Sequence, residues 1–373
     1  MGIPQKNLWP YDEVKISGDA REPRMVTVST PWLKFKMEVE ADEVPRLQTL
    51  IEKLSSEDGA QPDFNDVQWF FQSLASYPLT YVLPRPESFG IDSHEVSQQK
   101  LNQTSPVALL RDLCANSNIN QAIERFQSRT GEWKWTWDHE AALGFAQVEG
   151  GFDPETLFSI ARRFHLLNDI EWNKTGEMLE YVRGLKNDPA AFQSASALIV
   201  RQNHYITEQC ESVLKAGLPT SQSSYAAVSE FIQAEAGHDI ILSRALKSLG
   251  ADAATTKVLD TTVVLMEVFR EVAKRNFLAF AMVVDIFERT SYQGGDPLAS
   301  LLRAGGHDTA ARQADIHRDI NDSGGHENIA LGFLAEMKAV DSEYAQEALR
   351  LAEVATLTIH QLSSETLDLL RAN

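Results

Sequence analysis

Residues 231–250 read FIQAEAGHDIILSRALKSLG, and this stretch indicates how the chain folds. Its large apolar residues recur at helical spacing, so they would form one face of an amphipathic helix. Gly250 follows the last periodic residue, where glycine commonly ends a helix. We therefore predict a helix over residues 223–249 that packs its apolar face against other helices.

Most of the remaining chain repeats this pattern. Pro154 and Pro189 stand where helices should begin, because proline is tolerated in the first helical turn. Together the periodic stretches predict six or seven helices of about 20–40 residues, which favours a mainly α bundle. The other predicted helical stretches are 154–184, 188–217, 253–293, 307–338 and 342–370.

The first hundred residues have a different character. Residues 25–40 (MVTVSTPWLKFKMEVE) mix β-branched, aromatic and alternating apolar residues, which predicts one or two strands. Helical spacing follows at 44–54 and 63–76, and a short strand is expected at 79–83 before two prolines. We interpret this region as a small α+β module.

Polar residues and turn formers separate this module from the bundle, with short helices expected before residue 130. Three tryptophans at spacing two, in 131–138, predict a strand or an irregular packing segment. We divide the chain into a recognition or dimerisation module (1–85), a linker with short helices (86–150) and a helical bundle with a metal site (151–373).

The composition excludes several classes of function. The 373 residues include 34 Lys+Arg and 53 Asp+Glu, a formal net charge of −19. Such a surface repels phosphate, so we expect neither nucleic acid nor an anionic membrane as partner. The two cysteines, Cys114 and Cys210, are too few for a disulfide framework and fit a reducing, cytoplasmic compartment.

The long helices carry acidic residues and histidines at metal-ligand spacing. On a helix, Glu235 and His238 share a face and could bind one metal, although a surface ion pair would give the same spacing. Glu288 follows the apolar stripe of Val284, where a buried carboxylate needs a partner or a metal. Its alternative is a surface pair with Arg289 or another base, and Asp285 competes for the buried role.

Residues 315–327 read DIHRDINDSGGHE and hold two histidines among several carboxylates. On a regular helix His317 and His326 point to opposite sides. Both can face one centre only if the helix is disturbed between them, and the weak helix formers at 323–325 supply such a point. The alternative is an acidic helical turn with a solvated histidine.

His204 shares a helix face with Glu208 in the stretch predicted over 188–217. The pair could contribute to a metal site. A histidine that simply hydrogen-bonds a carboxylate, in the core or on the surface, explains it equally well.

Along the chain the motifs come in the order Glu-x-x-His, a single Glu and a His/Asp/His group. This order resembles that of the haem-oxygenase-like diiron oxidases and oxygenases. These are seven-helix proteins related to thiaminase-II and pyrroloquinoline-quinone synthase. The segment AEAGHDIILSRALKSLG is also similar to a helix of that superfamily with the pattern E-x-G-H…L-x-x-L-G. The resemblance covers roughly residues 155–345 and implies a haem-oxygenase-like bundle.

The resemblance implies iron ligands at Glu235, His238, Glu288, His317, Asp322 and His326. The family places an aspartate four residues after the first histidine of its last motif, where this chain has Asn321 and then Asp322. Either the helix bulges, or Asp319 replaces an expected ligand. The family also takes a carboxylate from its first core helix, for which Glu208 is the candidate and His204 the alternative.

By this resemblance the chain is expected to be an O2-dependent oxidase or oxygenase of specialised metabolism. It would hold Fe(II)/Fe(III), two ions per chain, in a donor set that suits non-haem iron. Asp239 and Glu327 are candidates to orient the histidines. The substrate would be a small metabolite or a carrier- or peptide-bound group, and the chain could form a homodimer.

The sequence is also compatible with two other functions. One is a helical binding or scaffold protein of the same fold whose metal site has eroded. The other is a metal-free oxidase or hydrolase in which histidines act as acids and bases.

Overall fold

The computed structural model describes residues 15–19, 22–29, 34–38, 45–46, 105–115, 117, 119–130, 133–288, 296–324, 326 and 329–372. Contacts within the chain define two units. The first comprises Met1–Asn102 with Asp138–Glu149, and the second comprises Gln103–Trp137 with Gly150–Asn373. The second unit therefore includes much of the region that the sequence assigns to a linker.

The first unit contains an antiparallel sheet in the order β1-β2-β3, formed by β1 (Lys15–Asp19), β2 (Glu22–Ser29) and β3 (Lys34–Glu38). Ser29 is the register partner of both Lys15 and Lys34. The strands expected within 25–40 are thus present, and β1 was not predicted. This unit also holds α6 (His139–Ala146) and β4 (Gln147–Val148).

Several expectations for the first unit lie outside the described residues. They are the helix at 63–76, the strand at 79–83 and all of the helix at 44–54 except residues 45–46, which are helical. Residues 133–138, by contrast, are described and have no regular structure. They therefore match the expected irregular packing segment and not a strand.

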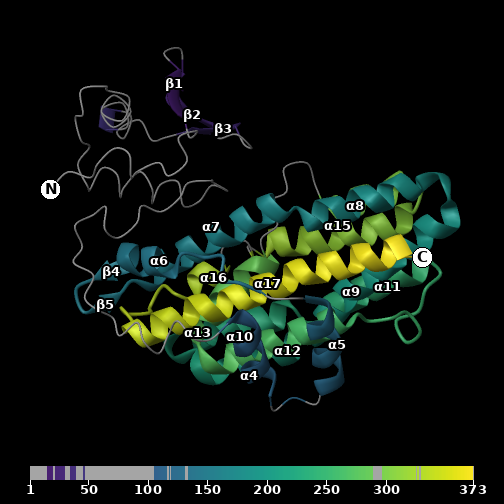
Figure 1. Cartoon of the computed structure of the whole chain (residues 1–373). Helices are drawn as coiled ribbons and strands as arrows, with labels where there is room; N and C mark the ends of the chain where they lie inside the picture. Colours follow the sequence, from purple (N-terminus) through teal and green to yellow (C-terminus); the bar gives the residue numbers. More distant parts are fainter. Residues whose placement is uncertain are drawn as a thin grey trace. The chain divides into compact units, whose positions relative to one another are not determined.

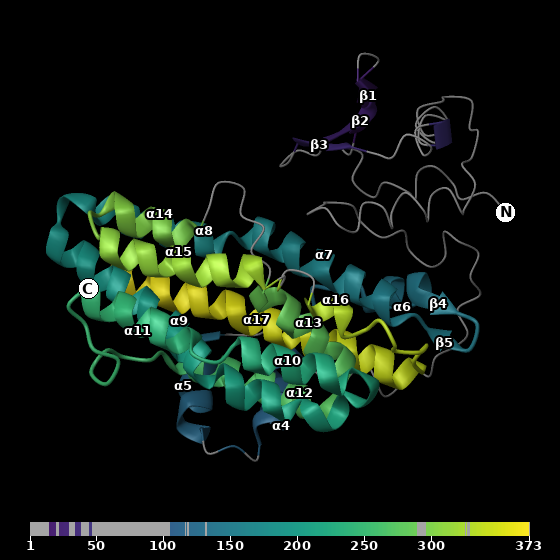
Figure 2. The same ribbon diagram turned by 180° about the vertical axis from the view of Figure 1, so that it is seen from behind.

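The second unit is a helical bundle, as predicted. Figures 1 and 2 show its longest helix, α17, in yellow, and this helix contacts α7, α8, α12 and α13. The helices are α4 (Pro106–Cys114), α5 (Asn120–Thr130), α7 (Pro154–Trp172), α8 (Lys174–Gly184), α9 (Pro189–Ala216), α10 (Tyr225–Ala234), α11 (His238–Ser248), α12 (Asp260–Arg275), α13 (Phe277–Glu288), α14 (Pro297–Ala304), α15 (Asp308–Ser323), α16 (Ile329–Gly332) and α17 (Ser342–Ala372).

Short elements connect these helices. They are β5 (Gly151–Phe152), whose Phe152 bridges to Val340, and the 3-10 turns η4 (Leu185–Asn187), η5 (Leu218–Thr220) and η6 (Gln222–Ser224).

An aspartate followed by a proline begins three of the helices. The side chains of Asp153, Asp188 and Asp296 accept hydrogen bonds from backbone N–H groups in the first turn of α7, α9 and α14. The aspartate satisfies a donor that the helix leaves unpaired, and the proline occupies a position that needs no donor. The starts expected at Pro154 and Pro189 are confirmed.

Two predicted helices are interrupted by asparagines. Asn173 adopts a left-handed conformation (φ 42°) and separates α7 from α8. Asn276 is extended (φ −147°) and completely buried between α12 and α13. Its side chain donates to the carbonyl of Tyr344 and accepts from the N–H of Ala279, so tertiary contacts hold the break in place.

Helix α13 lies in the centre of the bundle and carries Glu288 into it. All of its residues from Phe277 to Asp285 are buried. Phe280 stacks on Phe333 with ring centroids 6.1 Å apart, and Asp285 pairs with Arg162 of α7. Although α13 is strongly apolar, no helix in the described part of the chain has both the length and the apolarity that a membrane span requires.

Candidate metal centre

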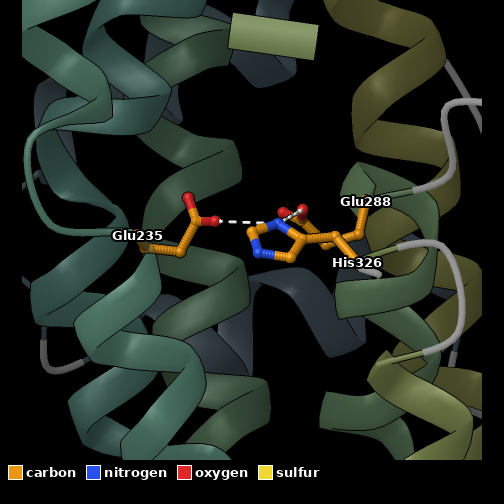
Figure 3. Close-up of side chains that lie close together, drawn as sticks. All are labelled: Glu235, Glu288 and His326. Atoms are coloured by element: carbon orange, nitrogen blue, oxygen red, sulfur yellow. Dashed lines mark hydrogen bonds and ion pairs between the residues drawn. The ribbon is translucent and has the colours of Figure 1, made fainter. Parts of the chain in front are cut away.

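Three acidic or imidazole side chains from separate segments meet inside the bundle. Figure 3 shows the His326 imidazole between the carboxylates of Glu235 and Glu288. His326 Nδ1 lies 3.0 Å from Glu288 Oε2 and 3.2 Å from Glu235 Oε1. One ligand-type atom from each residue lies within 4.8 Å of the others. All three side chains are buried, so this group has the geometry of a possible metal site.

A turn, and not a helix face, brings Glu235 beside His238. Helix α10 ends at Ala234 and α11 begins at His238, so the predicted continuous helix over 223–249 is broken. Gly237 between them has φ +92°, a left-handed conformation that favours glycine. The turn leaves His238 Nδ1 3.0 Å from Glu235 Oε2, the contact that the i, i+3 spacing predicted.

The end of α15 positions His326. The helix stops at Ser323, and the N–H of Gly324 donates to the carbonyl of Ile320. A Cβ on Gly324 would lie only 2.7 Å from His326 Nε2, so the imidazole packs directly on the glycine backbone. The ring of Phe231 meets the imidazole edge-on at 5.2 Å. The interruption expected between His317 and His326 is therefore present.

Two further histidines adjoin this group. The His238 ring centroid is 5.2 Å from that of His317 and 6.1 Å from that of His326. We call Glu235, His238, Glu288, His317 and His326 the carboxylate–histidine cluster. It joins the end of α10, the start of α11, the end of α13 and α15 with the turn that follows it.

Several buried atoms of the cluster lack a hydrogen bond. Among the described residues, Glu235 Oε1, both ring nitrogens of His238 and Nε2 of His317 are inaccessible to solvent and have no partner in hydrogen-bond geometry. Glu235 Oε1 lies close to an imidazole nevertheless, at 3.2 Å. Buried polar atoms are rarely left unsatisfied, and lone pairs that converge without hydrogen-bond alignment are what a metal site requires.

Burial and mutual contact shift the pKa values of the cluster. Burial alone would lower the pKa of His326, but the two adjoining carboxylates raise it to about 9. Burial would raise the pKa of Glu235, yet the close contacts with the His238 and His326 imidazoles lower it to about 2. Burial raises the pKa of Glu288. Burial, then the charge of His238, lowers the pKa of His317 to about 4.

The structure does not bring the predicted first-helix ligands to this cluster. The side chain of Glu208 is 45% exposed and lies 3.6 Å from Arg201. His204 is buried on the same helix, α9, where its Nδ1 contacts a guanidinium nitrogen of Arg201 at 2.9 Å. Burial, then the charge of Arg201, lowers the His204 pKa. The i, i+4 spacing was correct, but both side chains contact Arg201 and neither belongs to the group of possible metal ligands.

The two aspartates of α15 are also placed elsewhere. The side chains of Asp319 and Asp322 are 64% and 51% exposed, and both lie beside Arg318. They were expected near His326 because a continuous helix would put the three residues on one side. Since α15 ends at Ser323, His326 turns inward while the aspartates remain on the surface.

Of the two residues expected to orient the histidines, the structure describes only Asp239. Asp239 is half-buried in the first turn of α11, and its charge acts on His204. Glu327 lies outside the described residues.

The sequence did not indicate that three further residues lie near the cluster. Phe231 packs on His326, and Gly324 provides the space for its ring. Cys210 of α9 has a raised pKa, first through burial and then through the charges of Glu235 and Glu288. The only sequence signal for Cys210 was its position on an amphipathic helix, which does not reveal what it faces.

Comparisons with known proteins do not assign the chain to a family: no family model, no curated protein and no solved structure matches it.

Proposed function

We propose that this chain is a non-haem iron, O2-dependent oxidase or oxygenase with a haem-oxygenase-like bundle. The observation that carries the proposal is the buried group of Glu235, Glu288 and His326, whose ligand atoms converge from three segments. Resemblance of the sequence motifs to the haem-oxygenase-like oxidases supports the choice of iron and O2.

The donor atoms fit a divalent transition metal. Metal–ligand bonds of about 2.0–2.2 Å put neighbouring ligands of one ion about 3 Å apart. The two distances from His326 Nδ1, 3.0 and 3.2 Å, agree with that spacing. Two carboxylates balance a 2+ charge in a buried site, and a set of oxygen and imidazole donors suits Fe(II) better than a thiolate-preferring ion.

The contacts of Glu235 favour two ions over one. Its Oε1 faces His326 and its Oε2 faces His238, at 3.2 and 3.0 Å. A carboxylate whose two oxygens face different imidazoles is suited to bridge two metals. His326 and Glu288 would then hold one ion, and His238 with His317 would hold the second.

Bound iron would supply the redox steps and O2 binding that amino-acid side chains cannot provide. The side chains of the cluster would bind the iron and offset its charge in the bundle interior. The apolar residues of α13 would keep bulk water away from Glu288, since Phe280 and its neighbours are buried and stack on Phe333. The proposed substrate is a small metabolite or a carrier- or peptide-bound group.

The ion pairs favour one alternative, a scaffold protein of the same fold without a metal. A protonated His326 between two carboxylates, with its pKa raised to about 9, neutralises part of the cluster. This arrangement leaves Nε2 of His317 and both nitrogens of His238 unsatisfied, which a metal ion would correct.

Anaerobic iron loading tests the proposal. The purified full-length chain is freed of metal, loaded with Fe(II), desalted and analysed for iron. We expect about two ions per chain, in line with a bridging carboxylate. Glu288→Gln and His326→Gln should weaken iron binding by at least about tenfold, because each removes a buried ligand. His238→Gln and His317→Gln should reduce the count to about one ion.

Matched controls come from the predicted ligands that the structure places on the surface. Glu208→Gln and Asp322→Asn alter the same residue types but should leave iron binding unchanged. Exposure of the loaded protein to O2 should consume O2 and oxidise the iron. Absence of stoichiometric iron, or equal losses in the cluster and surface variants, would exclude the metal site, and bound iron inert to O2 would exclude the oxidase.

A further inference from the structure

A second feature of the bundle is a cavity of about 310 Å³ against α17. Its size is at the lower end of ligand pockets, which suits a small molecule. Its walls come from the irregular segment 133–136, the junction of α7 with α8, and one face of α17. The lining residues are Trp133, Lys134, Thr136, Trp172, Lys174, Leu357, His360, Gln361 and Ser364.

Hydrogen bonds to the buried Glu353 and to Asn168 hold the irregular wall in place. Glu353 of α17 is completely buried, and its Oε1 accepts from the N–H and hydroxyl of Thr136 and from the N–H of Trp137. Asn168 of α7 donates to the Thr136 hydroxyl at 3.1 Å. A segment without regular structure is thus fixed to two helices, so the cavity wall is preorganised.

His360 lines this cavity and has an unsatisfied ring nitrogen. The residue is only 4% exposed, and its Nε2 has no hydrogen-bond partner among the described residues. Its Nδ1 lies 3.8 Å from Asp169 Oδ1, beyond hydrogen-bond distance. The Trp172 ring meets the imidazole edge-on at 4.6 Å and 80°. His360 therefore carries a polar atom that the protein itself does not satisfy, and a ligand that reorients this lining side chain would satisfy it.

The charge of the lining is opposite to that of the chain. The lining residues include Lys134 and Lys174 but no aspartate or glutamate, although the chain carries a net charge of −19. Lys174 pairs with Glu177 at 3.0 Å. Lys134 is exposed and makes no ion pair within the part of the chain that the structure describes. An anionic group in the cavity would therefore meet an uncompensated cation.

We propose that this cavity binds a small planar aromatic carboxylate. Trp133 and Trp172 contribute flat apolar surface for the ring. Lys134 attracts the carboxylate, and the His360 side chain, once reoriented by binding, hydrogen-bonds a polar atom of the ligand through Nε2. The site is built from residues outside the carboxylate–histidine cluster, so binding does not require a metal ion.

Calorimetric titration of the metal-free full-length chain tests this proposal with two matched probes. The probes are 4-hydroxybenzoate and its uncharged analogue 4-hydroxybenzamide. We expect the benzoate to bind saturably to one site per chain and the amide to bind at least about tenfold more weakly. A tenfold difference corresponds to about 1.4 kcal/mol, which is the contribution of about one charge-assisted contact.

Three variants locate the site. Lys134→Gln should weaken benzoate binding by about tenfold without changing the affinity for the amide. Trp172→Leu should weaken both probes, with its circular dichroism spectrum confirming the fold. Lys186→Gln, which alters an exposed lysine of η4 outside the lining, should change neither.

Three results would overturn the proposal. They are no saturable binding of the benzoate up to about 10 mM, an affinity for the amide equal to that for the benzoate, and equal losses in Lys134→Gln and Lys186→Gln. Because the titration is done without metal, its outcome is independent of whether the chain binds iron.

Discussion

Replacing Gly324 with alanine perturbs the carboxylate–histidine cluster without removing any ligand. The added Cβ would lie 2.7 Å from His326 Nε2 and 2.8 Å from its Cδ2, where ordinary contacts begin at 3.4 Å. The imidazole must therefore move by roughly 0.7 Å. It cannot do so freely, because Glu235 and Glu288 hold its Nδ1 at 3.2 and 3.0 Å.

Two opposing terms set the size of this effect. Loss of one hydrogen bond between charged groups costs about 1.5–3 kcal/mol. Replacement of glycine by alanine in a compatible conformation contributes about 0.4–1 kcal/mol in the other direction, and Gly324 has a helical φ of −76°. We expect a net destabilisation of about 1–2 kcal/mol, by denaturant unfolding of the metal-free chain, and iron affinity weakened by about 10- to 100-fold.

NMR titration of the His326 imidazole gives a direct readout. In the parent chain its pKa is raised to about 9, and displacement from the carboxylates should lower it. Gly184→Ala is the matched control, because Gly184 has a helical φ of −62° and a Cβ there meets nothing within 4 Å. If Gly324→Ala titrates and binds iron like the parent, the packing of the imidazole on Gly324 has been misread.

Three further predictions follow from other contacts. Asn276→Ala should lower the free energy of unfolding by about 2–4 kcal/mol, because it removes hydrogen bonds to Tyr344 and Ala279 in a buried site. Urea unfolding measures this loss, and a value below about 0.5 kcal/mol would contradict the prediction. Burial lowers the pKa of His360 to about 4 from 6.5, so its neutral form stabilises the fold fully above pH 6.5. That contribution, about 3 kcal/mol, should disappear as the pH falls from 6.5 to 4, and His360→Phe should show a shallower decline in stability than the parent over that window. At an Fe(II) concentration 100 times the dissociation constant, the parent should gain about 2.7 kcal/mol of stability and melt at a higher temperature. Glu288→Gln, with iron binding at least about tenfold weaker, should gain at most about 1.4 kcal/mol from that site at the same concentration; calorimetry under anaerobic conditions measures both.

Local patterns were sufficient to predict the helical architecture. The Asp-Pro pairs at residues 153–154 and 188–189 favour a helix start through contacts within the first turn. These contacts do not depend on what the helix packs against. The spacing of Glu235 and His238 likewise placed both residues at one point of the fold. That conclusion held although a turn at Gly237 replaces the expected helix, because residues so close in the chain have few ways to separate.

Tertiary structure decided which candidates point inward. Glu208 and Asp322 have the residue type and spacing of ligands, yet Arg201 and Arg318 pair with them near the surface. Periodicity states which residues share a face, but the packing of neighbouring helices determines whether that face is buried.

The meeting of Glu288 with His326, 38 residues away in the chain, was beyond local patterns for the same reason. It requires α13 in the centre of the bundle and α15 to end at Ser323, so that His326 reaches the interior. Sequence by itself determined the helices and the residue types available to hold a metal. Only the packing of several helices brought those residues together, because contacts between distant segments depend on the whole fold and not on any one stretch of it.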